Sequence, residues 1–168
     1  MRGLFIGRFQ PFHKGHLNDV KTALKEVDEL IIAIGSSQES NTKKNPFSAD
    51  KRKNMIELAL KKENITNYKI FNVPDFNNDV KWLGFIKNNL PQFDVVFISD
   101  KNTDGERWVE LCLKDKFPIK KIHALKNISS TIIRELIIDN KPWNKLVTED
   151  VALYIDKING IKKIKDIG

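Results

Sequence analysis

The chain has 168 residues, and we expect residues 1–168 to form a single domain of ordinary size. Apolar residues make up 40% of it, with 8 Gly and 6 Pro, a composition that argues against disorder. Every apolar run is too short to span a bilayer, and the N-terminus lacks a small-residue cleavage site, so neither a membrane partner nor a secretion signal is expected.

The formal net charge of +7 fits a solvated lysine-rich surface, a nucleic-acid partner or an anionic small-molecule substrate. Charge alone does not choose among these three. A nucleic-acid partner is not expected, because the chain has no long basic block interleaved with aromatic residues. The single cysteine, Cys112, cannot form an internal disulfide, which fits a reducing cytoplasm.

Apolar runs of strand length alternate with apolar residues at helical spacing along the whole chain. In chain order, the expected elements are a strand at 3–7, a helix at 17–27, a strand at 30–35, a helix at 48–60, a strand at 68–73, a helix at 80–90, a strand at 94–99, a helix at 105–116, a strand at 119–125, and helices at 129–140 and 148–158. This alternation predicts an α/β, Rossmann-like fold: a parallel sheet of about five strands, helices on both faces and a helical C-terminal end. Ligands bind such sheets outside the carboxyl ends of the strands.

The first strand is followed by the segment 7–16, Gly-Arg-Phe-Gln-Pro-Phe-His-Lys-Gly-His. Free backbone N–H groups and the positive end of the helix dipole face outward at such a turn, so we expect a phosphate site. His13 and His16 are three residues apart and share one helix face. Gly15 permits a close backbone approach, and the Arg8 guanidinium is a forked donor suited to phosphate.

A zinc site and the common nucleotide-binding motifs fit this turn less well. A histidine pair can bind zinc, but the chain offers only His123 and Cys112 as further nitrogen or sulfur ligands, so no protein metal site is expected. The sequence has neither a Gly-x-Gly-x-x-Gly fingerprint nor a P-loop motif, so any nucleotide must be bound in another way.

A second anion site is expected where Ser129 and Thr131 begin a helix, with Arg134 one turn further on. Taken alone, this motif is more typical of an ordinary helix N-cap followed by a solvated arginine. Its occurrence together with the first turn favours the functional interpretation.

The segment 7–16 closely resembles the signature of archaeal-type nicotinamide mononucleotide adenylyltransferases, members of the HxGH nucleotidyltransferase superfamily. Further segments resemble elements of that family in the same order: 34–38 (IGSSQ), 45–52 (NPFSADKR), 75–78 (DFNN) with Trp82, and 129–134 (SSTIIR). The chain departs from the family at 99–102, where Ser-Gly-Asn is common, and at Ile132, where glutamate is common.

The resemblance implies an enzyme of NAD biosynthesis that transfers the adenylyl group of ATP to nicotinamide mononucleotide, giving NAD and pyrophosphate. His13, His16 and Arg134 would be its catalytic residues. The residues expected to contact ATP are Gly7, Arg8, Phe9, His13, Gly15, His16, Ser129, Thr131 and Arg134. Arg52, Asn77 and Trp82 are expected to contact the mononucleotide, with the Trp82 ring beside the nicotinamide. Mg²⁺ would be held by phosphates and water, and relatives of this kind form homo-oligomers.

Two other functions remain open. The first is a related adenylyltransferase with another acceptor, such as phosphopantetheine, and the Gly7–Gln10 string argues against it. The second is a non-catalytic module that binds nucleotide or nucleic acid. The presence of His13, His16 and Arg134 together argues against that second function.

Overall fold

The computed structural model describes residues 1–101 and 103–168, and these form two compact units. The first unit comprises residues 1–7, 18–36 and 67–124, and the second comprises residues 8–17, 37–66 and 125–168. The chain passes between the units several times, so neither unit is a continuous segment.

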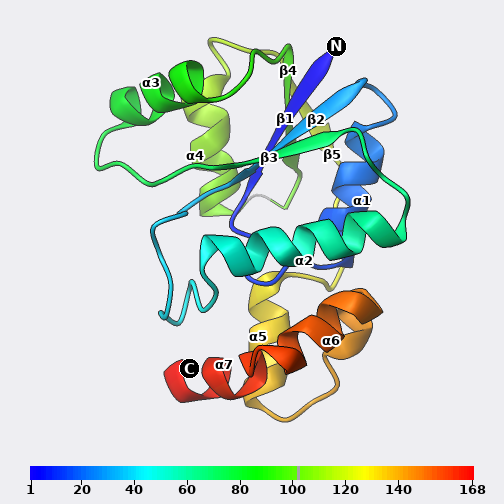
Figure 1. The fold of residues 1–168 in the computed structure, drawn as a ribbon. Coiled ribbons are helices and arrows are strands. Elements are labelled where there is room, and N and C mark those ends of the chain that lie inside the picture. Colours follow the sequence, from blue (N-terminus) through cyan, green and yellow to red (C-terminus); the bar gives the residue numbers. More distant parts are fainter. Residues whose placement is uncertain (102) are drawn as a thin grey trace. The chain divides into compact units, whose positions relative to one another are not determined.

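The first unit holds a parallel sheet of five described strands in the order β3-β2-β1-β4-β5 (Figure 1). The strands are β1 (Arg2–Gly7), β2 (Glu29–Ile34), β3 (Tyr68–Asn72), β4 (Val95–Ser99) and β5 (Ile119–Ile122). β1 pairs with both β2 and β4, so the strand order reverses beside β1. This switch point confirms the expected Rossmann-like α/β fold.

The helices follow the predicted order. They are α1 (Lys14–Ala23), α2 (Ala49–Lys62), α3 (Asp79–Asn89), α4 (Asp104–Leu113), α5 (Ser130–Ile138), the short 3-10 helix η1 (Asn144–Leu146), α6 (Glu149–Lys157) and α7 (Gly160–Ile167). The sequence did not predict α7, which follows a left-handed residue, Asn159, with φ of 55°. No helix in residues 1–101 and 103–168 is long and apolar enough to cross a membrane.

The core of the first unit lies between the sheet and the helices α3 and α4 (Figure 1). Leu4, Ile31 and Val96 belong to the central strands and are fully buried. Trp82 of α3 and Leu113 of α4 pack in the same cluster. The apolar runs read as strands in the sequence are therefore buried strands of a parallel sheet.

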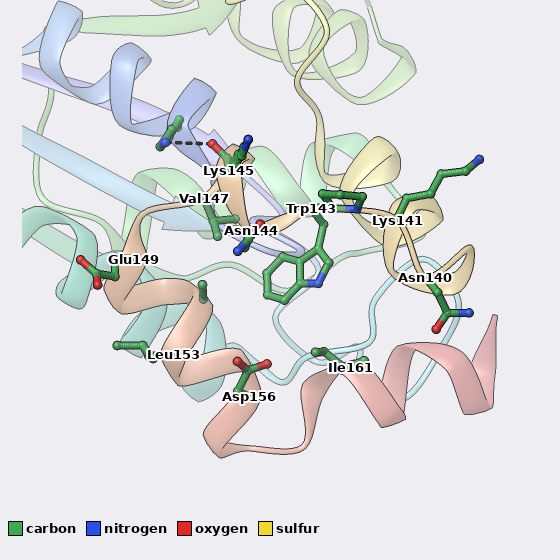
Figure 2. A pocket seen from close by; sticks show the side chains of 13 residues that line it. Asn140, Lys141, Trp143, Asn144, Lys145, Val147, Glu149, Leu153, Asp156 and Ile161 are labelled. Atoms are coloured by element: carbon green, nitrogen blue, oxygen red, sulfur yellow. Dashed lines mark hydrogen bonds between the residues drawn. The ribbon is translucent and has the colours of Figure 1, made fainter.

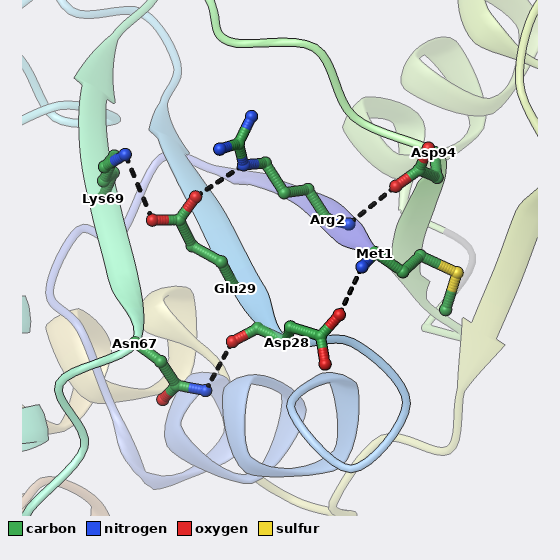
Figure 3. A network of polar contacts seen from close by, with 7 residues as sticks. All are labelled: Met1, Arg2, Asp28, Glu29, Asn67, Lys69 and Asp94. Carbon is green, nitrogen blue, oxygen red and sulfur yellow. Dashed lines mark hydrogen bonds and ion pairs between the residues drawn. The ribbon is translucent and has the colours of Figure 1, made fainter.

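Polar contacts join the amino ends of four neighbouring strands (Figure 3). The Arg2 Nε donates to Glu29 at 2.6 Å, and the Lys69 Nζ lies 3.2 Å from the other oxygen of the same carboxylate. The Arg2 backbone N–H donates to the Asp94 carboxylate, just before β4. Exposed pairs of this kind stabilise a fold little, but they favour one register of adjacent strands.

One carboxylate, that of Asp19 on α1, is 1% exposed. Neither oxygen has a hydrogen bond of ordinary geometry in the described part of the chain, and the nearby Asn18 side chain offsets the burial only in part. Burial raises the pKa of the Asp19 carboxyl to about 6, and the positive charge of Lys101 opposes that rise. At neutral pH the folded protein therefore holds a negative charge that is buried away from water. In the unfolded chain the same carboxylate is hydrated, and its free energy is lower.

Asp19→Asn is expected to stabilise the protein at pH 8 by up to about 3 kcal/mol, because it removes this buried charge. A raised carboxyl pKa means that wild-type stability falls as pH rises from about 4 to about 6. The gain should therefore be smaller at pH 5 than at pH 8. Urea unfolding of both proteins at the two pH values measures it.

Asp115→Asn is the matched control, since Asp115 is an exposed aspartate of the same unit. It should give no gain that grows with pH. A gain from Asp19→Asn that is equal at pH 5 and pH 8 would contradict the assigned role of the buried charge.

Candidate functional site

From Arg8 onward, the turn between β1 and α1 belongs to the second unit, and its residues 9–13 are buried. Phe9 is 1% exposed and adopts a left-handed φ of 52°, while Arg8 remains exposed. The Phe9 ring meets the His16 imidazole edge-on at 4.9 Å, and the Phe12 ring lies 5.4 Å from it. Phe9, predicted to contact ATP, thus packs against His16 as a buried support.

The rings of His13 and His16 stack with their centroids 3.6 Å apart. The His16 backbone N–H donates to the His13 Nδ1 at 3.2 Å, and the His13 N–H donates to the His16 Nδ1 at 3.3 Å. Because each Nδ1 accepts a hydrogen bond, the proton of each neutral ring is on Nε2. The two imidazoles are therefore held as Nε2–H donors.

Gly15 lies between the two histidines, where a larger residue would collide with the His13 ring. A Cβ at this position would be 2.9 Å from both the Cε1 and the Nδ1 of His13, and 3.3 Å from the Ile128 Cγ2. The close approach that the sequence predicts at Gly15 is thus an approach to the His13 ring.

Hydrogen bonds with residues 37–66 hold the turn in place. The Gln10 amide donates to the Phe47 carbonyl at 2.8 Å and accepts from the Phe47 N–H at 2.9 Å. Arg52 is fully buried and donates to the Arg8 carbonyl at 2.9 Å. The sequence predicted that Arg52 contacts the mononucleotide. In the structure its guanidinium binds the backbone of the turn and has no surface open to a ligand.

The helix α5 holds the other side of the same turn. Ser129 caps it by accepting from the Ile132 N–H at 3.1 Å, and the Ser130 Oγ donates to the Pro11 carbonyl at 3.0 Å. Arg134 donates to the Gln10 carbonyl at 2.8 Å. The two predicted anion sites are thereby joined, and Ser130, which the sequence did not single out, is one of the contacts.

A cleft of about 290 Å³ opens beside Arg8 and Arg134, and we call it the basic cleft. Its lining residues are Arg8, Lys43, Lys44, Pro46, Thr131, Arg134, Glu135, Ile138, Ile164, Ile167 and Gly168. Four of these are cationic and one is acidic. Burial lowers the pKa of the Arg134 guanidinium, and the charge of Arg8 lowers it further. Like charges that converge in a recess indicate a site for an anion.

Lys43 and Lys44 of this cleft were not predicted as site residues. They lie in a polar loop, and their one signal in the sequence is their position just before the Asn45–Phe47 element. The Lys43 Nζ donates to the Gly168 carbonyl at 3.0 Å.

A larger cavity of about 790 Å³ lies around Trp143 (Figure 2). The Lys14 Nζ reaches this cavity and donates to the Lys145 carbonyl at 2.8 Å. The lysines that line the cavity are accompanied by the acids Glu149 and Asp156. Its charges are mixed, so the basic cleft is the better anion site.

The residues Asn77 and Trp82, predicted for the mononucleotide, belong to the first unit. Asn77 is exposed in the loop after β3. Trp82 is 2% exposed, and its ring meets that of Trp108 edge-on at 4.6 Å. The Trp82 ring is thus a core side chain, with no open face for a nicotinamide in this structure.

The segment 99–102 departs from the family pattern, and Asn102 lies outside the described residues. The Asp100 carboxylate accepts from the Ala124 N–H at 2.8 Å and lies 2.9 Å from the His123 ring. The Ala124 hydrogen bond, followed by that to His123, lowers the pKa of the Asp100 carboxyl. Aspartate at this position therefore joins the loop after β4 to the end of β5.

Two imidazole donors and a cleft of converging cations together suit an anionic ligand. In a chain that also contains a Rossmann-like sheet, such a site is typical of proteins that bind and transfer nucleotides. The chain belongs to the cytidylyltransferase-like family, whose model matches residues 4–136, and within it to the group of archaeal nicotinamide-nucleotide adenylyltransferases.

The similarity to these relatives extends over nearly the whole chain. The nicotinamide-nucleotide adenylyltransferase of Thermococcus onnurineus is 38% identical over 98% of this chain and 87% of its own length. That of Saccharolobus solfataricus is 40% identical over 99% of this chain and 96% of its own. The archaeal resemblance stated from the motifs is confirmed.

A solved structure shows the same fold. A bifunctional NMN adenylyltransferase/ADP ribose pyrophosphatase from Francisella tularensis, in complex with AMP and a manganese ion, has a TM-score of 0.80 and 25% identity to this chain. The alignment covers 99% of this chain, and the chain spans about half, 51%, of that structure.

Gly15→Ala is expected to lower kcat by tenfold or more, because the new methyl group displaces the His13 ring and unstacks it from His16. Gly105→Ala is the matched control, since a Cβ at Gly105 would meet nothing within 4 Å. Steady-state kinetics and thermal unfolding of both variants provide the measurement. A Gly15→Ala protein with normal kcat would show that the ring position is unimportant.

Proposed function

We propose that this protein joins the adenylyl group of ATP to nicotinamide mononucleotide and releases NAD and pyrophosphate. The observation that carries the proposal is the convergence of Arg8 and Arg134 in one cleft, on the turn that also holds two stacked imidazoles as Nε2–H donors. A triphosphate has the negative charge and the acceptor oxygens that suit such a site. The archaeal relatives support nicotinamide mononucleotide as the acceptor.

The reaction needs little covalent chemistry from the protein. The 5′-phosphate of the mononucleotide is already an anion at neutral pH and attacks the α-phosphorus, while the bond to pyrophosphate breaks. No protein base has to remove a proton from it. Catalysis then consists of positioning the phosphates and stabilising the charge that develops on them.

His16 and His13 have separate parts in this proposal. The half-buried His16 donates from Nε2 to the α-phosphate, where negative charge grows in the transition state. His13 is 1% exposed and acts mainly by stacking on His16 and fixing its orientation.

The basic cleft takes the β- and γ-phosphates. Arg134 and Arg8 hold the oxygens of the leaving pyrophosphate, and Lys43 and Lys44 add positive charge at the cleft edge. The first N–H groups of α5, beside Thr131, point to the same anion.

Mg²⁺ enters this proposal bound to the phosphates. In residues 1–101 and 103–168, no group of three or more His, Cys, Asp or Glu side chains is placed to hold a metal ion. The ion would therefore keep phosphate and water as ligands, and it would neutralise part of the triphosphate charge. Assembly into a homo-oligomer and a cytoplasmic location, which suits an unpaired Cys112, belong to the same proposal.

The direct test is the product. The purified protein, supplied with ATP, Mg²⁺ and nicotinamide mononucleotide, is expected to form NAD and pyrophosphate in equal amounts, measured by chromatography. Phosphopantetheine offered as the acceptor should give no product. Binding of ATP without any NAD formation at saturating substrate would leave only a nucleotide-binding module.

Two variants test the division of roles. His16→Ala is expected to lower kcat by about 10²–10³ while ATP affinity changes little, because Arg8 and Arg134 still hold the triphosphate. Arg134→Ala should weaken ATP binding and lower kcat, since it contacts the leaving group and also ties the turn through Gln10.

Steady-state kinetics and calorimetric ATP titrations measure both effects. His123→Ala is the histidine control, because His123 is 84% exposed and lies at the end of β5. If His16→Ala abolishes ATP binding and keeps a normal kcat at saturation, the assigned roles are wrong.

A further inference from the structure

The two C-terminal helices, α6 and α7, lie against the helices that hold the histidine turn. The segments that resemble the family end at residue 134, so these segments assign no role to α6 or α7. Both helices belong to the second unit, as the turn does. α6 packs against α2, and α7 packs against α5 (Figure 1). The C-terminal helices are therefore in direct contact with both helices that supply donors to the turn.

Gly160 begins α7 at a corner where its neighbours leave no room for a side chain. A Cβ at this position would be 2.9 Å from the Ile155 carbonyl oxygen and 3.1 Å from the Phe47 Cε1. The Ile155 oxygen belongs to the backbone of α6 and cannot rotate away as the end of a long side chain can. An added methyl group would therefore have to move α7 and press on the Phe47 ring.

Phe47 connects this corner to the turn. Its ring is fully buried, and its backbone N–H and carbonyl both bind the Gln10 side-chain amide. Gln10 is also buried, and its own carbonyl accepts a hydrogen bond from Arg134 at 2.8 Å. Because a close-packed interior transmits displacements, a movement of Phe47 also moves Gln10 and the Arg134 guanidinium.

The same helix contributes to the wall of the basic cleft. Gly160 and Ile164 are four residues apart, so they lie on one face of α7, and both are buried. Ile164 and Ile167 line the cleft together with Arg134. A shift at the start of α7 therefore changes the cleft wall as well as the contact with Phe47.

We infer that Gly160 and Phe47 are positioning residues of the adenylyl-transfer site, and that α7 fixes the Arg134 guanidinium relative to the histidine turn. This inference rests on the proposed function. Neither residue has to touch a substrate, because each acts through Gln10. Catalysis by positioning depends on small distances between the phosphates and their donors, so a slight shift of Arg134 lowers turnover.

Phe47→Leu removes the ring atom that meets Gly160 and keeps the backbone groups that bind Gln10. It should lower kcat about fivefold and weaken the binding of magnesium pyrophosphate, measured by calorimetry, by a similar factor. Phe93→Leu is the matched control, because Phe93 is also buried but lies in the first unit, just before β4. It should lower the melting temperature and change neither value. Equal kinetic effects of the two substitutions in folded protein would overturn the role of Phe47.

A double-mutant cycle tests whether Gly160 acts through Phe47. Gly160→Ala alone should lower kcat about fivefold, whereas Gly105→Ala should leave it unchanged. Because both substitutions disturb the same contact, Gly160→Ala combined with Phe47→Leu should also lower kcat only about fivefold. A loss of roughly 25-fold, as expected for independent sites, would overturn the connection between the two residues.

The inference and the proposed function fail in different ways. Absence of NAD formation by the wild type overturns the function, whatever the variants do. Normal kcat and normal pyrophosphate binding in both variants, beside a wild type that forms NAD, overturn the inference. Thermal unfolding shows which variants are folded at the assay temperature. If Gly160→Ala does not fold, pyrophosphate binding and kcat of Phe47→Leu still decide the outcome.

Discussion

The site depends on how the polar backbone of the turn from Arg8 to His13 is satisfied. This turn has no regular secondary structure, yet much of it is buried, so its carbonyl groups need donors from elsewhere. Arg52, Arg134 and Ser130 supply them to the carbonyls of residues 8, 10 and 11. These donors come from α2 and α5, so the hydrogen bonds that stabilise the turn also bring the separate motifs together.

The same contacts impose an electrostatic cost on the protein without its ligand. Arg134 reaches the turn only by lying near Arg8, and burial together with that charge lowers the pKa of its guanidinium. A triphosphate bound there, as proposed, would relieve this repulsion, so the arrangement of the cations would favour its binding. The stacked histidines are likewise fixed before a ligand binds. Their Nδ1 atoms accept hydrogen bonds from backbone N–H groups, which leaves Nε2 as the donor of each ring.

Carboxylates of the first unit hold neighbouring groups in position. Asp79 and Asp100 each hold a neighbouring group by hydrogen bonds, Trp108 in one case and the end of β5 in the other. Asp19 differs from both, because burial makes its charge a cost to folding at neutral pH. An acidic residue therefore has opposite effects on this fold, depending on whether donors reach it.

The local pattern of the sequence was enough to determine the order of strands and helices, the parallel sheet and the histidine turn. Strands, helices and turns depend on residues that are close together in the sequence, so the sequence alone was enough to predict them. The helix α7 was missed, because its short lysine-rich segment continues the pattern of α6 across a single left-handed residue.

Only the tertiary structure decided which predicted residues are open to a ligand. Arg52 and Trp82 carry the right chemistry, but contacts with distant residues bury both. Conversely, Lys43 and Lys44 belong to a polar loop that looks like ordinary surface, and folding places them at a cleft. Burial depends on which segments pack together, and side-chain chemistry in the sequence does not specify that packing.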